Sequence, residues 1–441
     1  MDSMSLKVKN IEFQGFTLDL GEKILMRDQQ LVAIPPKALE LLLVIAERPG
    51  HIFEKADLIE SVWPDTFVEE GNLPYTITLL RKALGDNAEK PRFIETVPRR
   101  GYRFIADVTH HNSNGDGRMN VGPVSKARNS YLRAQYLRRR NKAELITSIT
   151  HADHAISEDP EFALAYTHKA ETYNLMGFYA FLPPAEAFLK AKDAARTALD
   201  LDETMPEAYN SLAFVSLFYE WDLAKAEREW LRALELKRNY AIGRQWYANV
   251  LTAAGQWDDA IYQLTLAQEI DPASPVLISK PGWSYYYARE YDKAIEPCER
   301  AIGFDDTFVY AHLWLGQALE RKGEYERAIT EFSTVVSRLQ GAPEPIALLA
   351  HAYAVSGNRK RARAILADLL EHFSERYISP YHVATVYVGM DEKEQAMAWL
   401  ETAYRDRQYP MVLLKHDPRL DPLRSDPRFR DLLQRITPLA S

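Results

Sequence analysis

Residues 309–338 read VYAHLWLGQALERKGEYERAITEFSTVVSR, and this stretch decides the fold of most of the chain. It consists of two segments with apolar residues at helical spacing, separated by a polar turn that contains Gly323. A small residue, Gly316, lies in the first segment, and Ala328 lies in the second. The stretch therefore predicts two helices whose backbones approach closely at these small residues.

The same pattern recurs every 34 residues along the C-terminal half of the chain. The small positions are Ala248, Gly282, Gly316, Ala350 and Ala384 in the first helices, and Ala260, Ala294, Ala328, Ala362 and Ala396 in the second helices. Larger apolar residues keep the same register at Leu251, Tyr285, Leu319, Tyr353 and Tyr387, and at Leu264, Cys298, Phe332, Leu366 and Leu400. Two series in phase predict a stack of helix pairs that share one continuous core.

This spacing and pattern resemble the tetratricopeptide repeat. Five consecutive units keep the register, and looser units extend it upstream, so residues 127–410 are expected to form about eight units of an all-α solenoid. Residues 411–441 contain several Asp-Pro steps and are expected to form the polar terminal cap that a solenoid needs for solubility. Cys298 falls on a core position, which favours a buried small apolar residue over a reactive thiol.

In tetratricopeptide units the first helix of each pair lines an inner groove, and the resemblance implies a set of groove residues here. They are Gln245, Asn249, Trp283, Tyr286, Tyr287, Tyr310, Gln317, His351 and Tyr381. Aromatic and amide side chains dominate this set, so the expected occupant is a protein segment, a peptide or a neutral small ligand. The alternative is that these aromatic residues pack between neighbouring repeats.

The first 108 residues have a different pattern. Residues 11–34 contain short apolar runs broken by turns, which predicts a small antiparallel sheet. Helices are expected over residues 38–48, 53–63 and 73–86, and the last has an apolar stripe at Leu73, Ile77, Leu80 and Leu84. The segment RFIETVPRRGYRFIADV, residues 92–108, predicts a β-hairpin with a basic tip.

This α+β order, together with LLRKAL and GYRF, resembles the winged-helix DNA-binding domain of the OmpR/PhoB type, as found in ToxR- and CadC-like regulators. The resemblance implies that residues 1–108 bind duplex DNA, with the third helix in the major groove and the hairpin at the minor groove. The implied DNA-binding residues are Asn72, Tyr75, Thr76, Thr78, Arg81, Lys82, Thr96, Arg99, Arg100 and Tyr102. The loop containing Trp63, Asp65, Thr66 and Phe67 is implied to contact RNA polymerase.

Local charge agrees with this interpretation. The 441-residue chain has a net charge of -8, and residues 1–108 are mildly acidic. Residues 79–105 nevertheless hold seven Lys and Arg against three acidic residues. The third helix departs from the family at Thr76, Thr78 and Leu79, where basic residues or histidine are common, which predicts weaker reading of base edges.

Residues 109–126 are rich in Gly, Asn and Ser and are expected to form a flexible linker. Without an N-terminal signal pattern, a long apolar stretch or paired cysteines, the sequence predicts a cytoplasmic, soluble protein with no membrane contact. It shows none of the common nucleotide-binding, hydrolase or metalloprotease motifs, so we expect no enzyme activity, no cofactor and no metal.

Two functional hypotheses remain at this point. The first is a one-component transcription regulator, whose winged helix binds DNA, as a homodimer on paired half-sites, and whose repeat array senses a ligand or partner. The second is an interaction scaffold whose winged helix no longer binds DNA. The basic hairpin favours the first hypothesis, and the net acidic charge of residues 1–108 favours the second.

Overall fold

The computed structural model describes residues 8–20, 24–27, 30–32, 34, 36–62, 72–98, 100–112, 127, 130–131, 142–272, 274–339, 342–371 and 377–436. The chain divides into two compact units, Met1–Asn120 and Val121–Ser441.

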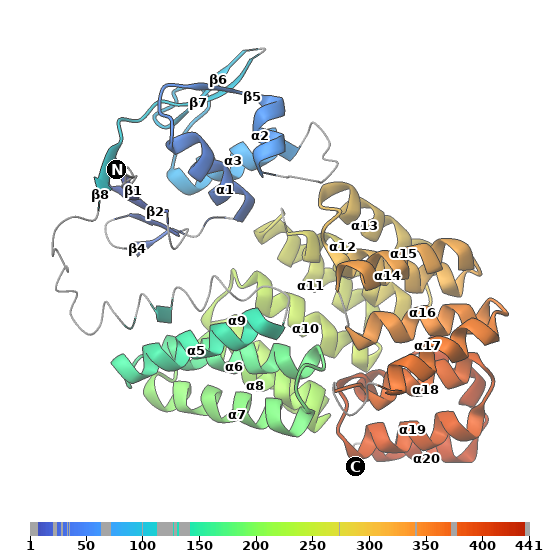
Figure 1. The fold of residues 1–441 in the computed structure, drawn as a ribbon. Helices are drawn as coiled ribbons and strands as arrows, with labels where there is room; N and C mark the ends of the chain where they lie inside the picture. Colours follow the sequence, from blue (N-terminus) through green and yellow to red (C-terminus); the bar gives the residue numbers. More distant parts are fainter. Residues whose placement is uncertain are drawn as a thin grey trace, which may run out of the picture. The chain divides into compact units, whose positions relative to one another are not determined.

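The N-terminal unit is an α+β domain with two antiparallel sheets (Figure 1). The first sheet has the strand order β4-β3-β2-β1-β8, and the second has the order β5-β7-β6. The strands are β1 (Val8–Phe13), β2 (Phe16–Asp19), β3 (Ile24–Arg27), β4 (Gln30–Leu31), β5 (Ile52–Glu54), β6 (Ile94–Val97), β7 (Gly101–Phe104) and β8 (Thr109–Asn112). The helices are α1 (Pro36–Ala46), α2 (Lys55–Val62) and α3 (Asn72–Leu84).

The apolar stripe predicted for the third helix is confirmed. Leu73, Ile77, Leu80 and Leu84 are at most 1% exposed and belong to the domain core. Phe13 anchors the same core, because its ring lies against Phe16, Phe93 and Phe104 at centroid distances of 5.1–5.8 Å. The sheet, the three helices and the hairpin thus share one apolar centre, as the winged-helix resemblance implied.

Two boundaries differ from the prediction. The segment predicted as the start of a helix at Phe53 forms strand β5, which pairs with β7, and α2 begins only at Lys55. Residues 109–112, assigned to the linker, form strand β8, with Thr109 opposite Glu12 in β1. Backbone pairing does not require apolar side chains, so a strand of polar sequence such as THHN escapes detection by hydrophobic pattern.

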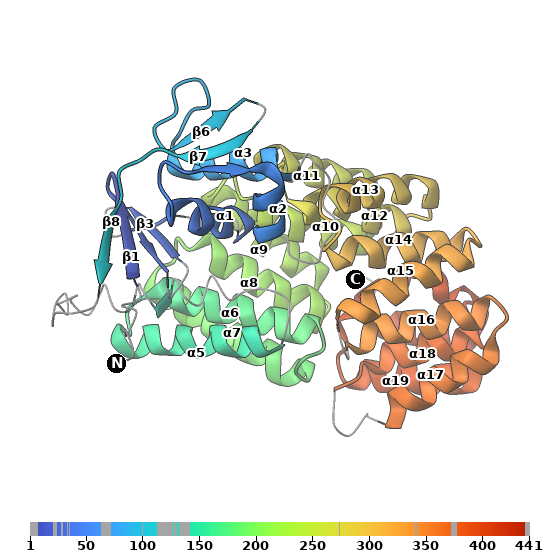
Figure 2. The ribbon, with the colours of Figure 1, turned by 45° about the horizontal axis from the view of Figure 1, so that its top comes forward.

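The C-terminal unit is a stack of antiparallel helix pairs (Figures 1 and 2). The first helices are α6 (Ala163–Phe178), α8 (Pro206–Val215, continued by the π-helix η1, Ser216–Glu220), α10 (Ala241–Ala254), α12 (Pro275–Tyr287), α14 (Val309–Arg321), α16 (Pro343–Val355) and α18 (Pro380–Gly389). Their partners are α7 (Pro184–Leu201), α9 (Leu223–Leu236), α11 (Trp257–Ile270), α13 (Tyr291–Phe304), α15 (Tyr325–Arg338), α17 (Arg359–Glu371) and α19 (Lys393–Arg405). Helix α5 (Lys142–Glu158) precedes the first pair. None of the described helices combines the length and the hydropathy that a membrane span requires.

The predicted 34-residue register is confirmed. The last five second helices begin at residues 257, 291, 325, 359 and 393, at constant intervals of 34. Small residues are required at the predicted contact, because a Cβ at Gly282 would lie 2.5 Å from the sulfur of Cys298 and one at Gly316 would lie 2.7 Å from the ring of Phe332. Cys298 is fully buried, and burial raises the pKa of its thiol, as expected for a core residue. These observations identify the array as a tetratricopeptide-repeat solenoid.

The C-terminal segment corrects the prediction of a polar cap. Residues 409–423 form two 3-10 helices, η3 (Tyr409–Leu413) and η4 (Pro418–Leu423), whose residues are largely buried. The ring of Tyr409 lies 4.3 Å from that of Phe178 in α6, and the imidazole Nε2 of His416 lies 3.2 Å from the carbonyl oxygen of Ala253 in α10. The segment therefore packs across the early repeats, and only α20 (Pro427–Ile436) packs on α19 as a terminal helix.

Candidate functional site

The outward face of α3 is smaller than the resemblance implied. Lys82 and Thr78 are exposed, and the Thr78 hydroxyl donates to the carbonyl of Pro74, one turn earlier in the helix. Tyr75 is half-buried. Thr76 is a correction, because its side chain is only 5% exposed and therefore lies on the core side of the helix. Helical periodicity explains the error, since Thr76 lies three residues after Leu73 and four before Leu80 and so shares the face of the apolar stripe.

The hairpin β6-β7 is held against α3 by two polar side chains. The guanidinium of Arg81 donates to the carbonyl of Ile94 at 2.9 Å and to the hydroxyl of Thr96 at 2.8 Å. The carboxylate of Asp86, just after the helix, accepts from the backbone N–H groups of Arg92 at 2.7 Å and Ile94 at 2.8 Å. Arg81 and Thr96, both predicted to contact DNA, thus bind each other and fix the angle between helix and hairpin.

Among the described predicted residues of the hairpin, Thr96 and Arg100 are exposed and Tyr102 is buried. Arg100 is exposed at the tip. Tyr102 is a correction, because its side chain is 5% exposed within the domain core, and burial raises the pKa of its phenol, against a smaller opposing effect of Arg81. Gly101 explains the tight packing here, since a Cβ on it would lie 1.9 Å from the carbonyl oxygen of Phe53 in β5.

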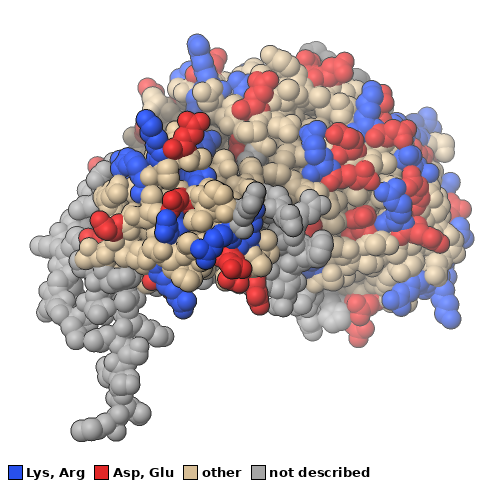
Figure 3. Space-filling model, turned by 90° about the horizontal axis from the view of Figure 1, so that it is seen from above, with Lys and Arg blue, Asp and Glu red and all other residues tan. Residues whose placement is uncertain are grey.

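Several predicted contacts cannot be placed. Arg99 and the loop residues Trp63, Asp65, Thr66 and Phe67 lie outside the described residues, as does the side chain of Asn72. On the face drawn in Figure 3, Lys and Arg side chains are interspersed with Asp and Glu.

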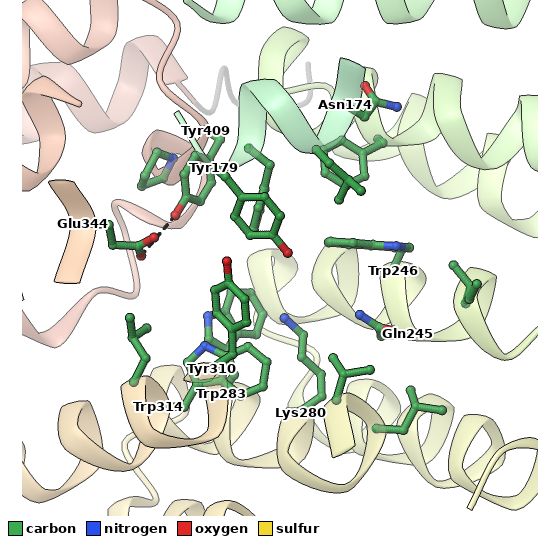
Figure 4. A pocket seen from close by; sticks show the side chains of 18 of the residues that line it. Asn174, Tyr179, Gln245, Trp246, Lys280, Trp283, Tyr310, Trp314, Glu344 and Tyr409 are labelled. Atoms are coloured by element: carbon green, nitrogen blue, oxygen red, sulfur yellow. Dashed lines mark hydrogen bonds between the residues drawn. The ribbon is translucent and has the colours of Figure 1, made fainter. Parts of the chain in front are cut away.

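A cavity of about 390 Å³ lies within the repeat array (Figure 4). Every first helix from α6 to α18 contributes at least one side chain to its wall, and η3 and η4 supply Tyr409 and Arg419. The repeats therefore do not form this site alone, because the C-terminal segment supplies part of its wall. The volume falls within the range typical of small-molecule sites.

The lining follows the repeat register. Ile242, Val276, Tyr310 and Glu344 occupy one repeat position, 34 residues apart, and all line the cavity. Trp246, Lys280, Trp314 and His382 occupy the position one turn later, and all four line it as well. Positions spaced by four residues share one face of a helix, so these two rows form the inward stripe of the first helices.

Lys280 is the most unusual side chain in this wall. It is 3% exposed, and its ammonium nitrogen lies 3.6 Å from the ring centroid of Trp283 and 5.0 Å from that of Trp314. Burial lowers the pKa of this ammonium from 10.5 to about 7. A cation between indole rings gains roughly 2 kcal/mol when desolvated, which offsets only part of the cost of removing it from water.

Two other charged groups of the wall, Glu344 and Arg419, have polar partners. Burial raises the pKa of the Glu344 carboxyl to about 7, against a smaller opposing effect of Arg419, and the Tyr409 hydroxyl lies 3.4 Å from this carboxyl. Arg419 pairs with the fully buried Asp417 at 2.6 Å, and Asp417 also accepts from the hydroxyl of Tyr381 at 2.6 Å.

Five of the nine predicted groove residues line the cavity. They are Gln245, Trp283, Tyr287, Tyr310 and Gln317. The other four are corrections, because they are at most 1% exposed and are not part of the cavity wall: Asn249, Tyr286, His351 and Tyr381. His351 illustrates the reason, since its imidazole Nδ1 lies 2.9 Å from the buried carboxylate of Glu320 in the preceding repeat. His351 thus joins neighbouring repeats, whereas Tyr381 donates to Asp417 of the C-terminal segment and Asn249 donates to carbonyl groups of its own helix.

The prediction missed the strongest polar features of the cavity. Lys280 was not selected, because the chosen register omitted the row that begins at Trp246, and Glu344 was not selected although it shares the row of the predicted residue Tyr310. The expectation of a groove with few charges is therefore incomplete. A signal was present in the sequence, since tryptophan, lysine, tryptophan and histidine recur at residues 246, 280, 314 and 382 in steps of 34 or twice that.

Comparison with known proteins agrees with the N-terminal fold. Residues 28–104 match the family described as transcriptional regulatory protein, C terminal. A cholera toxin homolog transcriptional activator of Vibrio parahaemolyticus is 35% identical over 100 residues, which cover 22% of this chain and 34% of that protein. The transcriptional regulator HilA of Salmonella typhimurium is 38% identical over 100 residues, which cover 23% of this chain and 18% of HilA.

Among solved structures, the DNA-binding domain of Klebsiella pneumoniae RstA in complex with the RstA box is 29% identical, with a TM-score of 0.21. It aligns over 22% of this chain and 97% of that domain. The matches to the two curated relatives span about a third of the first and less than a fifth of the second. Together with the fold described above, the family match shows that the chain carries an OmpR/PhoB-type domain of the transcriptional regulatory protein family, followed by a tetratricopeptide-repeat array.

Proposed function

We propose that this protein is a one-component transcription regulator whose N-terminal domain binds duplex DNA and whose repeat array senses a ligand. The observation that carries the DNA-binding role is the rigid connection between α3 and the hairpin. Arg81 and Asp86 fix the two elements that family members use on DNA, and they leave Lys82 and Arg100 exposed beside them. The proposed activity is binding and not catalysis.

The phosphate contacts are assigned to Lys82 on α3 and Arg100 at the hairpin tip. A long exposed cation at each of two elements suits phosphate contact, which positions a domain on DNA without reading its sequence. Few polar side chains remain on the exposed face of α3 to read base edges. We therefore expect paired domains on two half-sites to supply the specificity that a single domain lacks.

The sensory role is supported by the cavity in the array. All seven first helices, from α6 to α18, meet in one wall with aromatic, amide and charged side chains. A ligand there would contact every repeat and the C-terminal segment at once. Its binding free energy would therefore bias the arrangement of the whole array, which any ligand-dependent change in DNA binding requires.

The test uses the full-length protein. A genome-wide binding footprint provides the DNA site, and titration at several salt concentrations then compares the unaltered chain with Lys82→Ala plus Arg100→Ala. We expect weaker binding and a salt slope lowered by about two units. The matched control, Lys293→Ala plus Arg300→Ala, removes the same charge from exposed positions on α13 and should change neither quantity.

A second candidate function, a scaffold without DNA affinity, is favoured by one observation. Thr76 and Tyr102 are buried, so the domain has fewer outward polar side chains than the family pattern implies. If the full-length protein produced no footprint, and if the Lys82 and Arg100 variant bound DNA as the control does, the scaffold would be the better description.

A further inference from the structure

The cavity in the array contains a buried positive charge with no negative partner among the described residues. Lys280 projects from α12 into the cavity, as Figure 4 shows, and it lies over the rings of Trp283 and Trp314. It forms no ion pair or hydrogen bond within the described part of the chain. An isolated buried ammonium is costly, and proteins keep such groups mainly where a ligand or chemistry uses them.

The other ionisable groups of the wall do not compensate this charge. Arg419 is neutralised by Asp417, because its Nε and Nη2 donate to the two carboxylate oxygens of Asp417. Glu344 interacts with the hydroxyl of Tyr409, and its carboxyl lies 3.9 Å from His382. Glu171 and Asp271 also line the cavity, and neither forms an ion pair with Lys280. Lys280 is therefore a basic group of the described wall that lacks an ion-pair partner.

Neutral donors and flat apolar surfaces surround this charge. Gln245 and Gln317 line the wall from α10 and α14, are 8% and 6% exposed, and have no side-chain hydrogen bond within the described residues. Trp246, Trp283 and Trp314 add three indole rings. Amide N–H groups can complete the coordination of an oxyanion, while indole faces suit a planar or apolar body.

From this arrangement we propose that the cavity binds a small organic carboxylate, with its carboxylate group at Lys280 and its ring or apolar body against the indoles. This inference rests on the proposed sensory role of the array and specifies its ligand. A carboxylate fits better than a phosphate, because a single free ammonium matches one negative charge and the remaining donors are few. The proposed ligand is thus an anion, in place of the neutral small ligand that the sequence predicted.

The experiment compares acids with their uncharged amides on the full-length protein. Isothermal titration calorimetry at pH 7 is carried out with benzoate and benzamide, indole-3-acetate and indole-3-acetamide, and 2-naphthoate and 2-naphthamide. The two members of each pair have nearly the same shape and differ in charge. We expect at least one acid to bind about tenfold or more tightly than its amide. Equal binding within every pair, or no binding of any acid, would overturn the proposal.

Substitution of the lysine locates the site. Lys280→Met keeps the length and apolar character of the side chain and should reduce the affinity for the acid about tenfold, to that of the amide. The matched control is Lys293→Met, at a position 61% exposed on α13, which should retain the preference for the acid. Retention of that preference by Lys280→Met would show that another cation binds the anion. Tighter binding of tryptamine than of indole-3-acetate would assign recognition to Glu344 and would also overturn the proposal.

The two proposals fail in different ways. If the acid binds through Lys280 but leaves DNA affinity unchanged, the carboxylate site stands and the sensory role is lost. If DNA binding responds to a molecule that the Lys280→Met variant recognises as well as the unaltered protein does, the regulator stands and the carboxylate site is lost. If Lys280→Met does not fold, the comparison of acids with amides on the unaltered protein still decides the question.

Discussion

Arg289 and Asp421 form a bidentate ion pair, with both nitrogen–oxygen distances at 2.6 Å, although 132 residues separate them in the sequence. The pair ties the turn after α12 to the C-terminal segment. Both side chains are partly exposed, so we expect a coupling free energy of only about 1 kcal/mol in a double-mutant cycle with Arg289→Ala and Asp421→Ala, measured by urea unfolding. The ion pair between Arg300 and Glu296, four residues apart in one helix, is the control. Its coupling free energy should be smaller, because it does not join distant segments.

Loss of the buried ion pair between Asp417 and Arg419 should lower the free energy of unfolding far more than loss of the partly exposed pair between Arg289 and Asp421. Burial alone would raise the pKa of Asp417, but the charge and hydrogen bonds of Arg419 outweigh it and hold this pKa below its ordinary value. Arg419→Met leaves the carboxylate buried without its partner, at an expected cost of about 3–5 kcal/mol at pH 7.

The pH dependence gives this prediction a second readout. A depressed carboxyl pKa in the folded state stabilises it above the unfolded pKa of Asp417, near 3.8, and this contribution is lost as the pH falls through the folded value. In Arg419→Met the guanidinium no longer outweighs burial, so the pKa of Asp417 rises in the folded variant and its buried carboxylate takes up a proton as the pH falls. The stability deficit of Arg419→Met should therefore shrink in chemical denaturation between pH 7 and pH 4. A deficit that is constant over this range would assign the effect to packing.

Lys280 should make the array less stable than it would be with an apolar residue. Its pKa falls from 10.5 to about 7 on folding, so stability is lost as the pH decreases from above 10.5 toward 7. We expect Lys280→Met to be more stable by on the order of 2–4 kcal/mol at pH 7, with the advantage disappearing near pH 10.5. Thermal unfolding at the two pH values measures this, and an advantage that persists at high pH would contradict it.

Arg81 and Lys82 are adjacent but should behave differently. Arg81→Met removes the hydrogen bonds to the hairpin and should destabilise the N-terminal domain by about 1–3 kcal/mol. Lys82→Met should leave stability unchanged and lower the salt slope of DNA binding by about one unit, because this side chain is exposed. Thermal unfolding and salt-dependent titration of each variant separate the two effects, and identical behaviour would contradict the assignment.

Gly101 should not tolerate a side chain. An added Cβ would overlap the carbonyl oxygen of Phe53, so Gly101→Ala must separate β5 from β7. We expect the free energy of unfolding of the N-terminal domain to fall by roughly 3 kcal/mol or more. Gly85→Ala is the control, since nothing lies within 4 Å of that Cβ and only its φ of +65° is unfavourable, at about 1 kcal/mol. Equal losses would show that the close approach is relieved at little cost.

Much of the fold was predictable from local pattern. The 34-residue register predicted the helix pairs, because each repeat buries the same positions, and the stripe from Leu73 to Leu84 predicted the core face of α3. Strand β8 was not predictable in this way, since its stability comes from backbone pairing with β1 and not from its own side chains.

The site was only partly predictable. Trp283 and Gln317 were found because they follow the inward register, whereas Tyr286 and His351 were misplaced by a small rotation of the helix face. The role of residues 409–423 was missed for another reason. Asp417 and Arg419 resemble surface residues in sequence, and their burial depends on each other and on repeats far earlier in the chain.

The packing of residues 409–423 across the early repeats also constrains how the protein can evolve. Open solenoids gain and lose whole repeats, because each unit contacts only its neighbours. Here the deletion or duplication of one 34-residue unit would move Tyr409 and His416 away from Phe178 and Ala253, which they contact now. The contacts of residues 409–423 with the early repeats therefore constrain the number of repeats. Homologous arrays of this kind should diverge by substitutions at the cavity-lining positions and keep a constant length.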